Sequence, residues 1–378
     1  MKKKICFVVS SVLTAKFFLR FHIEKLSEEY DVYLVGNFCE EDIKSISYLN
    51  LKGVKSIAIE RKINLVKDII AVKNFVCYIN EKQFDAIHSL APKAGLIAAI
   101  AGKIAKTKNR IHIFTGQVWY TKKGLFKFLL KQLDKFIVLL NTKVLVDSYS
   151  QLEYLKKEGI INIQNSMVLG KGSISGVDFN RFSPNVKLKE QLKEEFNISN
   201  DTVVFLFMGR INKDKGVFDL ANSFYSLLSN NKNILLFFIG YDEEGCVDKI
   251  KKIIGDDKYF KYYGSTDYPE KYIHIGDVFC LPSYREGFGT SIIEASSCKL
   301  AIICSDTYGL KDTIIDGETG MRHEVGNVSQ LKNNMEILAS NFDLIQLYGE
   351  NGYEYVQKNF SSNFVSNEWL KFYRDILT

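Results

Sequence analysis

Residues 281–295 read LPSYREGFGTSIIEA and contain two glutamates, Glu286 and Glu294, eight positions apart. The apolar run just before this stretch predicts a strand, and its glycines predict a loop. A helix is expected to start near Thr290 and Ser291, whose hydroxyls can cap it. Because the free amides of a helix start attract anions, the stretch predicts a phosphate seat beside two carboxylates that suit sugar hydroxyls. These features together indicate a site for a sugar nucleotide.

The length and composition predict two globular domains. The chain has 378 residues, of which 46% are hydrophobic, and this exceeds one typical core. Seven scattered cysteines without a CxxC pair favour reduced thiols in a cytoplasmic protein over zinc or disulfides. The start, MKKKICFVVSSVL, has the basic head of a signal peptide, but polar residues soon interrupt it and no cleavage site follows. We therefore expect a buried first strand there.

The formal charge of +6 is unevenly distributed. Residues 1–185 contain 29 lysines and arginines against 16 acidic residues, or +13, which leaves 21 against 28, or −7, for residues 186–378. A basic first half attracts phosphate-bearing partners or an anionic membrane leaflet. A solvated, lysine-rich surface without a partner explains the same count, and both interpretations stay open.

Strand-like and helical patterns alternate along the chain. The expected strands are residues 5–10, 32–35, 86–89, 110–114, 203–208, 235–239, 278–281 and 301–305. This alternation predicts an α/β protein with two doubly wound, Rossmann-like parallel-sheet domains that face each other across a cleft. The break at residues 176–184, GVDFNRFSP, separates a domain over 1–182 from one over 183–360. Residues 361–378 are expected to form a helix that packs back on the first domain.

The loop GRINKDKG, residues 209–216, follows the strand VVFLFM. Ligands of open parallel sheets bind beyond the carboxyl ends of the strands. Arg210 can hold two phosphate oxygens with its planar guanidinium, and Lys215 adds a second positive charge. An arginine and a lysine in a turn are more often solvated, but beside the Glu286 loop they favour a diphosphate site.

The two glutamates also fit a second kind of site, the acid–base pair of a hydrolase. That mechanism needs carboxyl groups roughly 5–9.5 Å apart on opposite sides of one bond. Spacing in the sequence does not establish this geometry. A position about one turn into the helix directs Glu294 toward the nucleotide end of a ligand, so we favour binding over hydrolysis.

The strings GRINKDKG, LPSYREGFGTSIIEA, DTIIDGETG and GVDFNRF resemble the retaining family-four glycosyltransferases of the GT-B fold, the glycosyl transferases group 1. The resemblance covers nearly the whole chain and is most specific over residues 203–327. It implies that Arg210 and Lys215 hold the donor diphosphate and that Glu286 contacts the hydroxyls of the transferred sugar, as the catalytic set. Glu294 is implied to bind the ribose.

The same resemblance implies further donor contacts. Main-chain groups of Gly287, Phe288, Gly289 and Thr290 contact the sugar and the phosphate, and Gly209 belongs to the same substrate site. The implied reaction transfers a hexosyl or N-acetylhexosaminyl group, with retention, from a nucleotide diphosphate, expected to be UDP. Fixed cations and a helix start stabilise the negative charge that grows on the departing diphosphate, so neither a metal nor another cofactor is expected.

The first domain gives fewer indications. Ser11 follows the first strand, where many relatives carry a glycine-rich loop, and a GxGxxG motif is absent, which disfavours nicotinamide binding. Thr115 and Gly116 stand where many relatives place a histidine against the donor sugar, so they and Gln117 are candidates for the cleft lining.

Two histidines of the first domain are ambiguous. His112 is expected inside a strand, as a core residue rather than a catalyst. His88 stands at a strand end, where a position facing the cleft and a structural role are both open.

Residues 122–140, KKGLFKFLLKQLDKFIVLL, form a basic amphipathic pattern. The apolar side chains at helical spacing are Phe126, Leu129, Leu130, Leu133, Phe136 and Leu140, and the lysines are Lys122, Lys123, Lys127, Lys131 and Lys135. Such a helix can lie on an anionic membrane. An ordinary helix with its apolar face in the core and its lysines in water is an equal alternative.

The resemblance and the basic first half together indicate a glycosyltransferase that acts on a lipid-linked glycan, expected to be linked to polyprenyl diphosphate. Its expected role is assembly of a surface polysaccharide such as O-antigen, lipopolysaccharide or capsule, in the cytoplasm or at the inner membrane face. The alternatives are a UDP-sugar epimerase of the same fold, a starch- or sucrose-type synthase, and a non-catalytic basic module for membranes or nucleic acid. Nucleic acid is not an expected partner, because the aromatic residues follow core periodicity instead of forming stacking platforms.

Overall fold

The computed structural model describes residues 2–60, 64–229 and 233–378. The chain divides into two compact units, an N-terminal unit of Met1–Ser175 with Ser362–Thr378 and a C-terminal unit of Gly176–Ser361. Segment 176–184 belongs to the C-terminal unit, because Val177 and Phe182 are buried in its core. The expected division at residues 182 and 183 therefore falls inside the C-terminal unit.

The N-terminal unit is built on a parallel sheet with the order β3-β2-β1-β4-β5-β6-β7 over the described residues. Its strands are β1 (Lys4–Val8), β2 (Asp31–Gly36), β3 (Gly53–Ser56), β4 (Ala86–Leu90), β5 (Asn109–Phe114), β6 (Lys143–Val146) and β7 (Ser166–Met167). Its helices are α1 (Val12–Thr14), the π-helix η1 (Ala15–Leu19), α2 (Arg20–Ser27), α3 (Glu40–Ser45), α4 (Leu65–Lys82), α5 (Pro92–Ile104), α6 (Gly124–Leu140), α7 (Tyr149–Lys157), η2 (Ile163–Asn165) and α15 (Ser362–Leu377).

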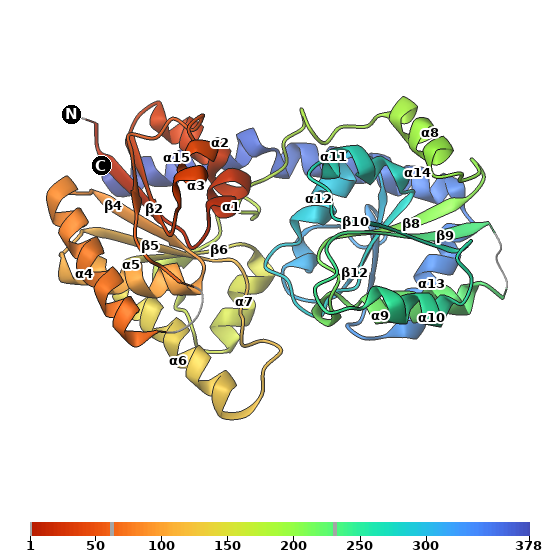
Figure 1. Ribbon diagram of the computed structural model, residues 1–378, viewed down its shortest axis with the longest axis horizontal. Coiled ribbons are helices and arrows are strands. Elements are labelled where there is room, and N and C mark those ends of the chain that lie inside the picture. The colour runs from red at the N-terminus through yellow and green to blue at the C-terminus, as the bar shows by residue number, and fades with distance from the viewer. Residues whose placement is uncertain (1, 61–63, 230–232) are drawn as a thin grey trace. The chain divides into compact units, whose positions relative to one another are not determined.

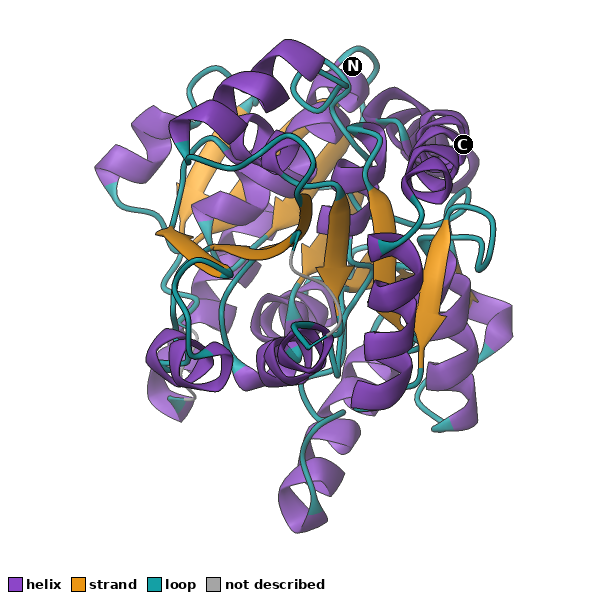
Figure 2. Ribbon diagram, turned by 90° about the vertical axis from the view of Figure 1, so that its right-hand side faces the viewer, coloured by secondary structure: helices purple, strands orange, loops and turns teal. Residues whose placement is uncertain are grey.

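Strand β1 shows how this sheet is buried on both faces. Ile5 and Phe7 pack with α2 and α15, whereas Cys6 and Val8 pack with α4 and α5. Successive side chains of a strand point to opposite faces, so a continuous apolar run suits a sheet that helices cover on both sides. Figure 2 shows strands enclosed between helices in this way. Helices α4, α5 and α6 form one layer, since α5 contacts both neighbours (Figure 1).

Helix α15 covers the face of the N-terminal sheet opposite α4 and α5, and it packs against His88. The Nδ1 atom of His88 lies 2.8 Å from the Tyr373 hydroxyl, and its ring stacks on Trp369 with 4.8 Å between centroids. Burial holds the pKa of His88 well below its ordinary value. His88 is thus a core residue, and the interpretation that it faces a cleft is wrong. His112 is also buried, within β5, with Nδ1 3.0 Å from Ser89 Oγ, as expected.

The C-terminal unit is built on a second parallel sheet, with the order β10-β9-β8-β11-β12-β13 over the described residues. Its strands are β8 (Val203–Met208), β9 (Ile234–Ile239), β10 (Phe260–Gly264), β11 (Val278–Leu281), β12 (Ala301–Ser305) and β13 (Gly320–His323). Its helices are α8 (Val186–Glu195), η3 (Lys213–Lys215), α9 (Val217–Leu227), α10 (Val247–Ile254), α11 (Pro269–Tyr272), η4 (Ile273–Ile275), α12 (Thr290–Ser297), η5 (Leu310–Asp312), α13 (Val328–Ala339) and α14 (Phe342–Phe360). Helices α9, α10 and α13 cover one face, and α12 and α14 cover the other (Figure 1).

The order in which the chain adds strands to this sheet changes direction between β8 and β11, which are parallel neighbours. From β8 the chain proceeds outward through β9 and β10, then returns to the other side of β8 as β11 and continues through β12 and β13. Ligands of open α/β sheets bind at the carboxyl ends of the strands on either side of such a reversal. The two loops at this position are residues 209–216 after β8 and residues 282–289 after β11.

Gly216 allows these two loops to touch. Its φ is +70°, and a Cβ atom at this position would lie 2.0 Å from the carbonyl oxygen of Pro282. The amide of Tyr284 also donates to the carbonyl of Asp214 at 2.8 Å. The β8 and β11 loops therefore form one packed unit of backbone, and no side chain fits at residue 216.

Replacing Gly216 tests this packing. Gly216→Ala meets both the positive φ and the Pro282 carbonyl, whereas Gly255→Ala, at φ +77° with no atom within 4 Å, meets the φ penalty alone. Urea unfolding should show a loss of about 1–2 kcal/mol for Gly255→Ala. Gly216→Ala should lose about 1–3 kcal/mol more, because it overpacks the contact. Equal losses would mean that the two loops do not depend on this contact.

Candidate active site

The β8 and β11 loops bring Lys215 and Glu286 together. The Lys215 ammonium pairs with Glu286 Oε1, and Ser283 Oγ donates to the same oxygen at 2.8 Å. The two side chains keep 19% and 13% of their surface exposed. A positive and a negative group thus lie in contact at the sheet reversal, both still accessible to a ligand.

Arg210 lies on the same loop but is more exposed. Its guanidinium is 3.1 Å from each carboxylate oxygen of Glu243, and Asn212 donates to Glu243 at 2.6 Å. Glu243 follows β9 and was missed in the sequence analysis, although the rule that sites lie after strands applies to β9 as well. Glu243 thus places a negative charge against the Arg210 guanidinium, where a phosphate group would be an alternative partner.

The start of α12 is capped differently from the prediction. The N-cap residue is Gly289, at φ +74°, and no side chain caps the helix, so the expected capping by the Thr290 and Ser291 hydroxyls is wrong. Across the described parts of the chain, the amides of Thr290 and Ser291 donate no hydrogen bond. Unpaired amides at a helix start attract anions, and the phosphate seat at α12 stays a prediction.

The glycine loop before α12 is held mainly by packing. The Phe288 side chain is 2% exposed and packs on Phe360 with 5.2 Å between ring centroids, so only its main chain can contact a ligand. Gly287 approaches Gly309 so closely that a Cβ atom on Gly309 would lie 2.3 Å from the Gly287 carbonyl oxygen. Gly209 follows β8, donates its amide to the Ile239 carbonyl at 2.9 Å, and has its own carbonyl packed against Gly240.

Glu294 lies in the fifth position of α12 and is half-buried. Its carboxylate makes no hydrogen bond or ion pair with any residue that the structure describes. Burial raises the pKa of Glu294 to about 7, against the opposing effect of Arg181 nearby. Arg181 itself pairs with Glu270 at 2.7 Å. An accessible carboxyl group without a partner suits hydroxyl donors such as those of a ribose.

The predicted residues of the N-terminal unit lie at the carboxyl edge of its own sheet. Ser11 follows β1, and its hydroxyl caps α1. Thr115 follows β5 and is exposed, next to Gly116 at φ +117°. Since β4 lies between β1 and β5, Ser11 and Thr115 are not neighbours. Gln117 is buried and accepts a hydrogen bond from Gln151 at 3.2 Å, so its role is structural.

Asp147 is a further polar residue at this edge that the sequence analysis missed. It follows β6 directly, is 4% exposed, and its Oδ1 atom has no hydrogen-bond partner among the described residues. Burial raises the pKa of Asp147 to about 7. The sequence does contain one sign of this site, because Asp147 directly follows the strand KVLV.

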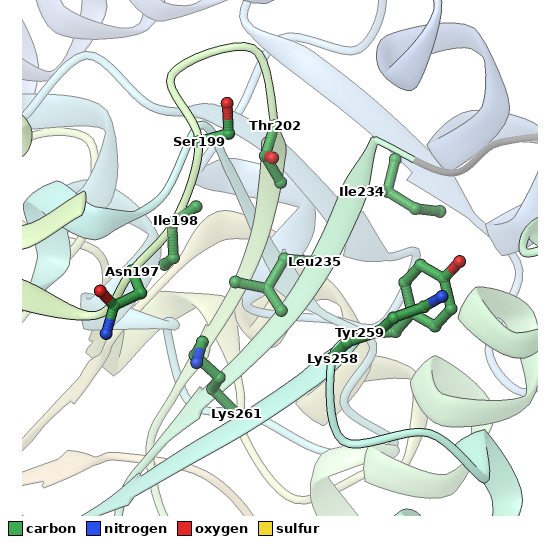
Figure 3. Close-up of a pocket in the computed structure, with 9 residues that line it drawn as sticks. All are labelled: Asn197, Ile198, Ser199, Thr202, Ile234, Leu235, Lys258, Tyr259 and Lys261. Atoms are coloured by element: carbon green, nitrogen blue, oxygen red, sulfur yellow. The ribbon is translucent and has the colours of Figure 1, made fainter. Parts of the chain in front are cut away.

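A shallow pocket of about 480 Å³ in the C-terminal unit lies away from the candidate site (Figure 3). Its lining residues are Asn197, Ile198, Ser199, Thr202, Ile234, Leu235, Lys258, Tyr259 and Lys261. They surround the amino ends of β8, β9 and β10, whereas the candidate site lies at the carboxyl ends. We therefore do not assign the donor to this pocket.

Comparison with known proteins shows what the chain resembles. Residues 189–355 match the family model described as Glycosyl transferases group 1. This match and the relatives named below support a glycosyltransferase. This glycosyltransferase is 28% identical over 381 residues to the capsular polysaccharide biosynthesis glycosyltransferase CapM of Staphylococcus aureus, over 100% of this chain and 98% of that protein. It is 23% identical to the UDP-Gal:alpha-D-GlcNAc-diphosphoundecaprenol alpha-1,3-galactosyltransferase of Escherichia coli, over 81% of this chain and 79% of that protein.

The fold comparison agrees. The glycosyltransferase matches the crystal structure of Anabaena Alr3699/HepE in complex with UDP with a TM-score of 0.81 at 15% identity, over 99% of this chain and all of that chain. The expected GT-B fold, with two Rossmann-like parallel-sheet domains, is confirmed.

The raised pKa of Glu294 predicts a pH-dependent loss of stability. Because the folded pKa, about 7, lies above the reference value of 4.5, the contribution of Glu294 to stability is complete below about pH 4.5 and is lost as the pH rises toward 7. Glu294→Gln removes this loss and should raise the Tm more at about pH 8 than at about pH 5. The rise in Tm at about pH 8 should exceed the rise at about pH 5 by roughly 2–4 °C for each kcal/mol of unfolding free energy that the substitution recovers.

Calorimetry at both pH values measures this effect, with Glu318→Gln, an exposed position of the same unit, as the control. A Glu294→Gln variant whose Tm changes equally at the two pH values would contradict the burial of the Glu294 charge.

Proposed function

We propose that this glycosyltransferase moves a sugar from a UDP sugar to a lipid-linked glycan, with retention of anomeric configuration and without a metal. The main support is the contact of Lys215 with Glu286. This contact and the unpaired amides of α12 lie where the strand order of the C-terminal sheet changes direction. The names of the relatives support the substrate classes: one contains UDP-Gal and a diphosphoundecaprenol-linked sugar, and another contains capsular polysaccharide biosynthesis.

The donor diphosphate binds between the cationic loop and the start of α12. Arg210 leaves Glu243, with which it forms an exposed and therefore weak ion pair, and turns its planar fork to the phosphates. Lys215 remains beside Glu286 and contributes the second positive charge. The main chain of Gly287 and Gly289 completes the seat.

Two carboxylates bind the two ends of the donor. Glu286, anchored by Ser283 and Lys215, accepts hydrogen bonds from hydroxyls of the transferred sugar. Glu294, whose carboxylate pairs with no residue that the structure describes, accepts hydrogen bonds from the ribose hydroxyls. Binding should hold Glu294 in its charged form, because a hydrogen bond donated to a carboxylate favours ionisation.

In the transfer step the bond between the anomeric carbon and the phosphate oxygen breaks. The acceptor hydroxyl oxygen forms a new bond to the same face of that carbon, and its proton passes to the departing diphosphate. Negative charge grows on the diphosphate, where Arg210, Lys215 and the α12 amides are already placed. We assign the acceptor to the N-terminal unit, which supplies Ser11, Thr115 and Gly116, and the reaction to the inner face of the cytoplasmic membrane.

Removing Lys215 tests the diphosphate site. Lys215→Ala should lower kcat/KM by about 10–150-fold, since a hydrogen bond to a charged group contributes roughly 1.5–3 kcal/mol. Lys213→Ala is the matched control, because Lys213 lies on the same turn with its side chain exposed. Turnover is followed by UDP release from a panel of UDP sugars with a lipid-linked acceptor extract. Equal activity of the two variants would remove Lys215 from the site.

The two glutamates should differ in kinetic effect. Glu294→Ala should weaken UDP binding, measured by thermal shift, because the ribose contacts exist in the ground state. Glu286→Ala should mainly lower kcat. If both variants lose UDP binding and kcat to the same degree, the two glutamates do not have these separate roles. Conversion of the UDP sugar into its epimer, without release of UDP, would overturn transfer altogether.

A further inference from the structure

Helix α6 exposes an apolar face that nothing else in the described chain covers. Its large side chains with at least 39% of their surface exposed are Leu125, Phe126, Phe128, Leu129, Leu133, Phe136 and Leu139. The first turns of the helix project from the rest of the N-terminal unit (Figure 1). Contiguous apolar surface of this kind is rare on monomeric proteins and marks an interaction site.

The protein-facing side of α6 carries polar groups as well as the apolar residues Leu130, Ile137 and Val138. Asp134 is buried and accepts a hydrogen bond from the Trp119 indole at 2.6 Å. Lys127 and Lys131 lie over the Trp119 ring at 5.7 and 5.3 Å, and Lys131 also pairs with Glu158 at 2.6 Å. The alternative of an ordinary helix, with its apolar face in the core and its lysines in water, therefore holds only in part. Ile137 is buried and Lys122, Lys123 and Lys135 are exposed, but the large apolar side chains named above are not covered.

The charges around the exposed apolar face of α6 indicate which kind of partner it fits. Segment 122–140 contains five lysines and one acidic residue, Asp134, whose carboxylate is turned inward. Lys122, Lys123 and Lys135 are exposed beside the apolar side chains. A second copy of the chain would bring the same lysines against them, and like charges disfavour such a contact. An anionic bilayer supplies both an apolar interior and negative headgroups.

We propose that α6 lies in the interface of an anionic membrane, with Leu125, Leu129 and Phe136 inserted among the acyl chains and Lys122 and Lys123 at the headgroups. None of the described helices has the length and apolar content of a membrane span. The proposal stands apart from the donor chemistry, and it fits the proposed function because a lipid-linked acceptor is reached from the membrane surface.

Vesicle flotation with the full chain tests the anchor. The protein should float with vesicles of equal parts phosphatidylcholine and phosphatidylglycerol, and much less with phosphatidylcholine alone. The triple variant Leu125→Gln, Leu129→Gln, Phe136→Gln should lower the partition by at least about tenfold, since each lost apolar contact weakens binding. Lys122→Glu with Lys123→Glu should lower it on the anionic vesicles only. Leu347→Gln, at an exposed leucine of α14, is the matched control and should float like the wild type.

A fluorescence measurement separates insertion from loss of folding. Phe128→Trp places an indole on the exposed face, while the two native tryptophans, Trp119 and Trp369, are each 1% exposed. Its emission should shift to shorter wavelength when anionic vesicles are added, and unchanged UDP thermal shifts in all variants confirm the fold. Absence of flotation, equal flotation of the triple variant, or a dimer in light scattering that the triple variant abolishes would overturn the proposal.

Discussion

The candidate site depends on the close approach of two loops at the reversal of the C-terminal sheet. Gly216 lies against the Pro282 carbonyl, and this backbone contact sets the distance across which Lys215 reaches Glu286. An ion pair built on exposed, flexible loops contributes little. Here both side chains are mostly buried and a third group, Ser283, holds the carboxylate. The charges are therefore fixed before a ligand arrives, which is the condition for electrostatic stabilisation of a transition state.

Much of the C-terminal unit could be predicted because its strands are continuous apolar runs and its loops follow them directly. The expected strands 203–208 and 278–281 match β8 and β11. The partners of the functional side chains could not be predicted, since Glu243 and Ser283 meet Arg210 and Glu286 only through the order of the strands. The cap of α12 was also missed, because a glycine at positive φ replaced the hydroxyl that local sequence favours.

The N-terminal unit was harder to predict, for a different reason. The local sequence around its histidines and in its amphipathic helix does not indicate which way these side chains face. His88 turns inward because Trp369 and Tyr373 cover it from the far end of the chain. Helix α6 places Asp134 against the Trp119 indole and leaves its larger apolar side chains exposed. In both cases the orientation involves a distant or buried polar contact, and periodicity alone does not contain it.

Helix α15 has a consequence for biosynthesis. The last described strand of the N-terminal unit ends at residue 167, yet part of the core of this unit comes from residues 365–377, which follow the whole C-terminal unit. Domains generally fold in the order in which they are synthesised. In this chain the whole C-terminal unit is synthesised before the residues that cover Phe7 and His88. The N-terminal unit therefore completes its core only after the C-terminal unit has been made.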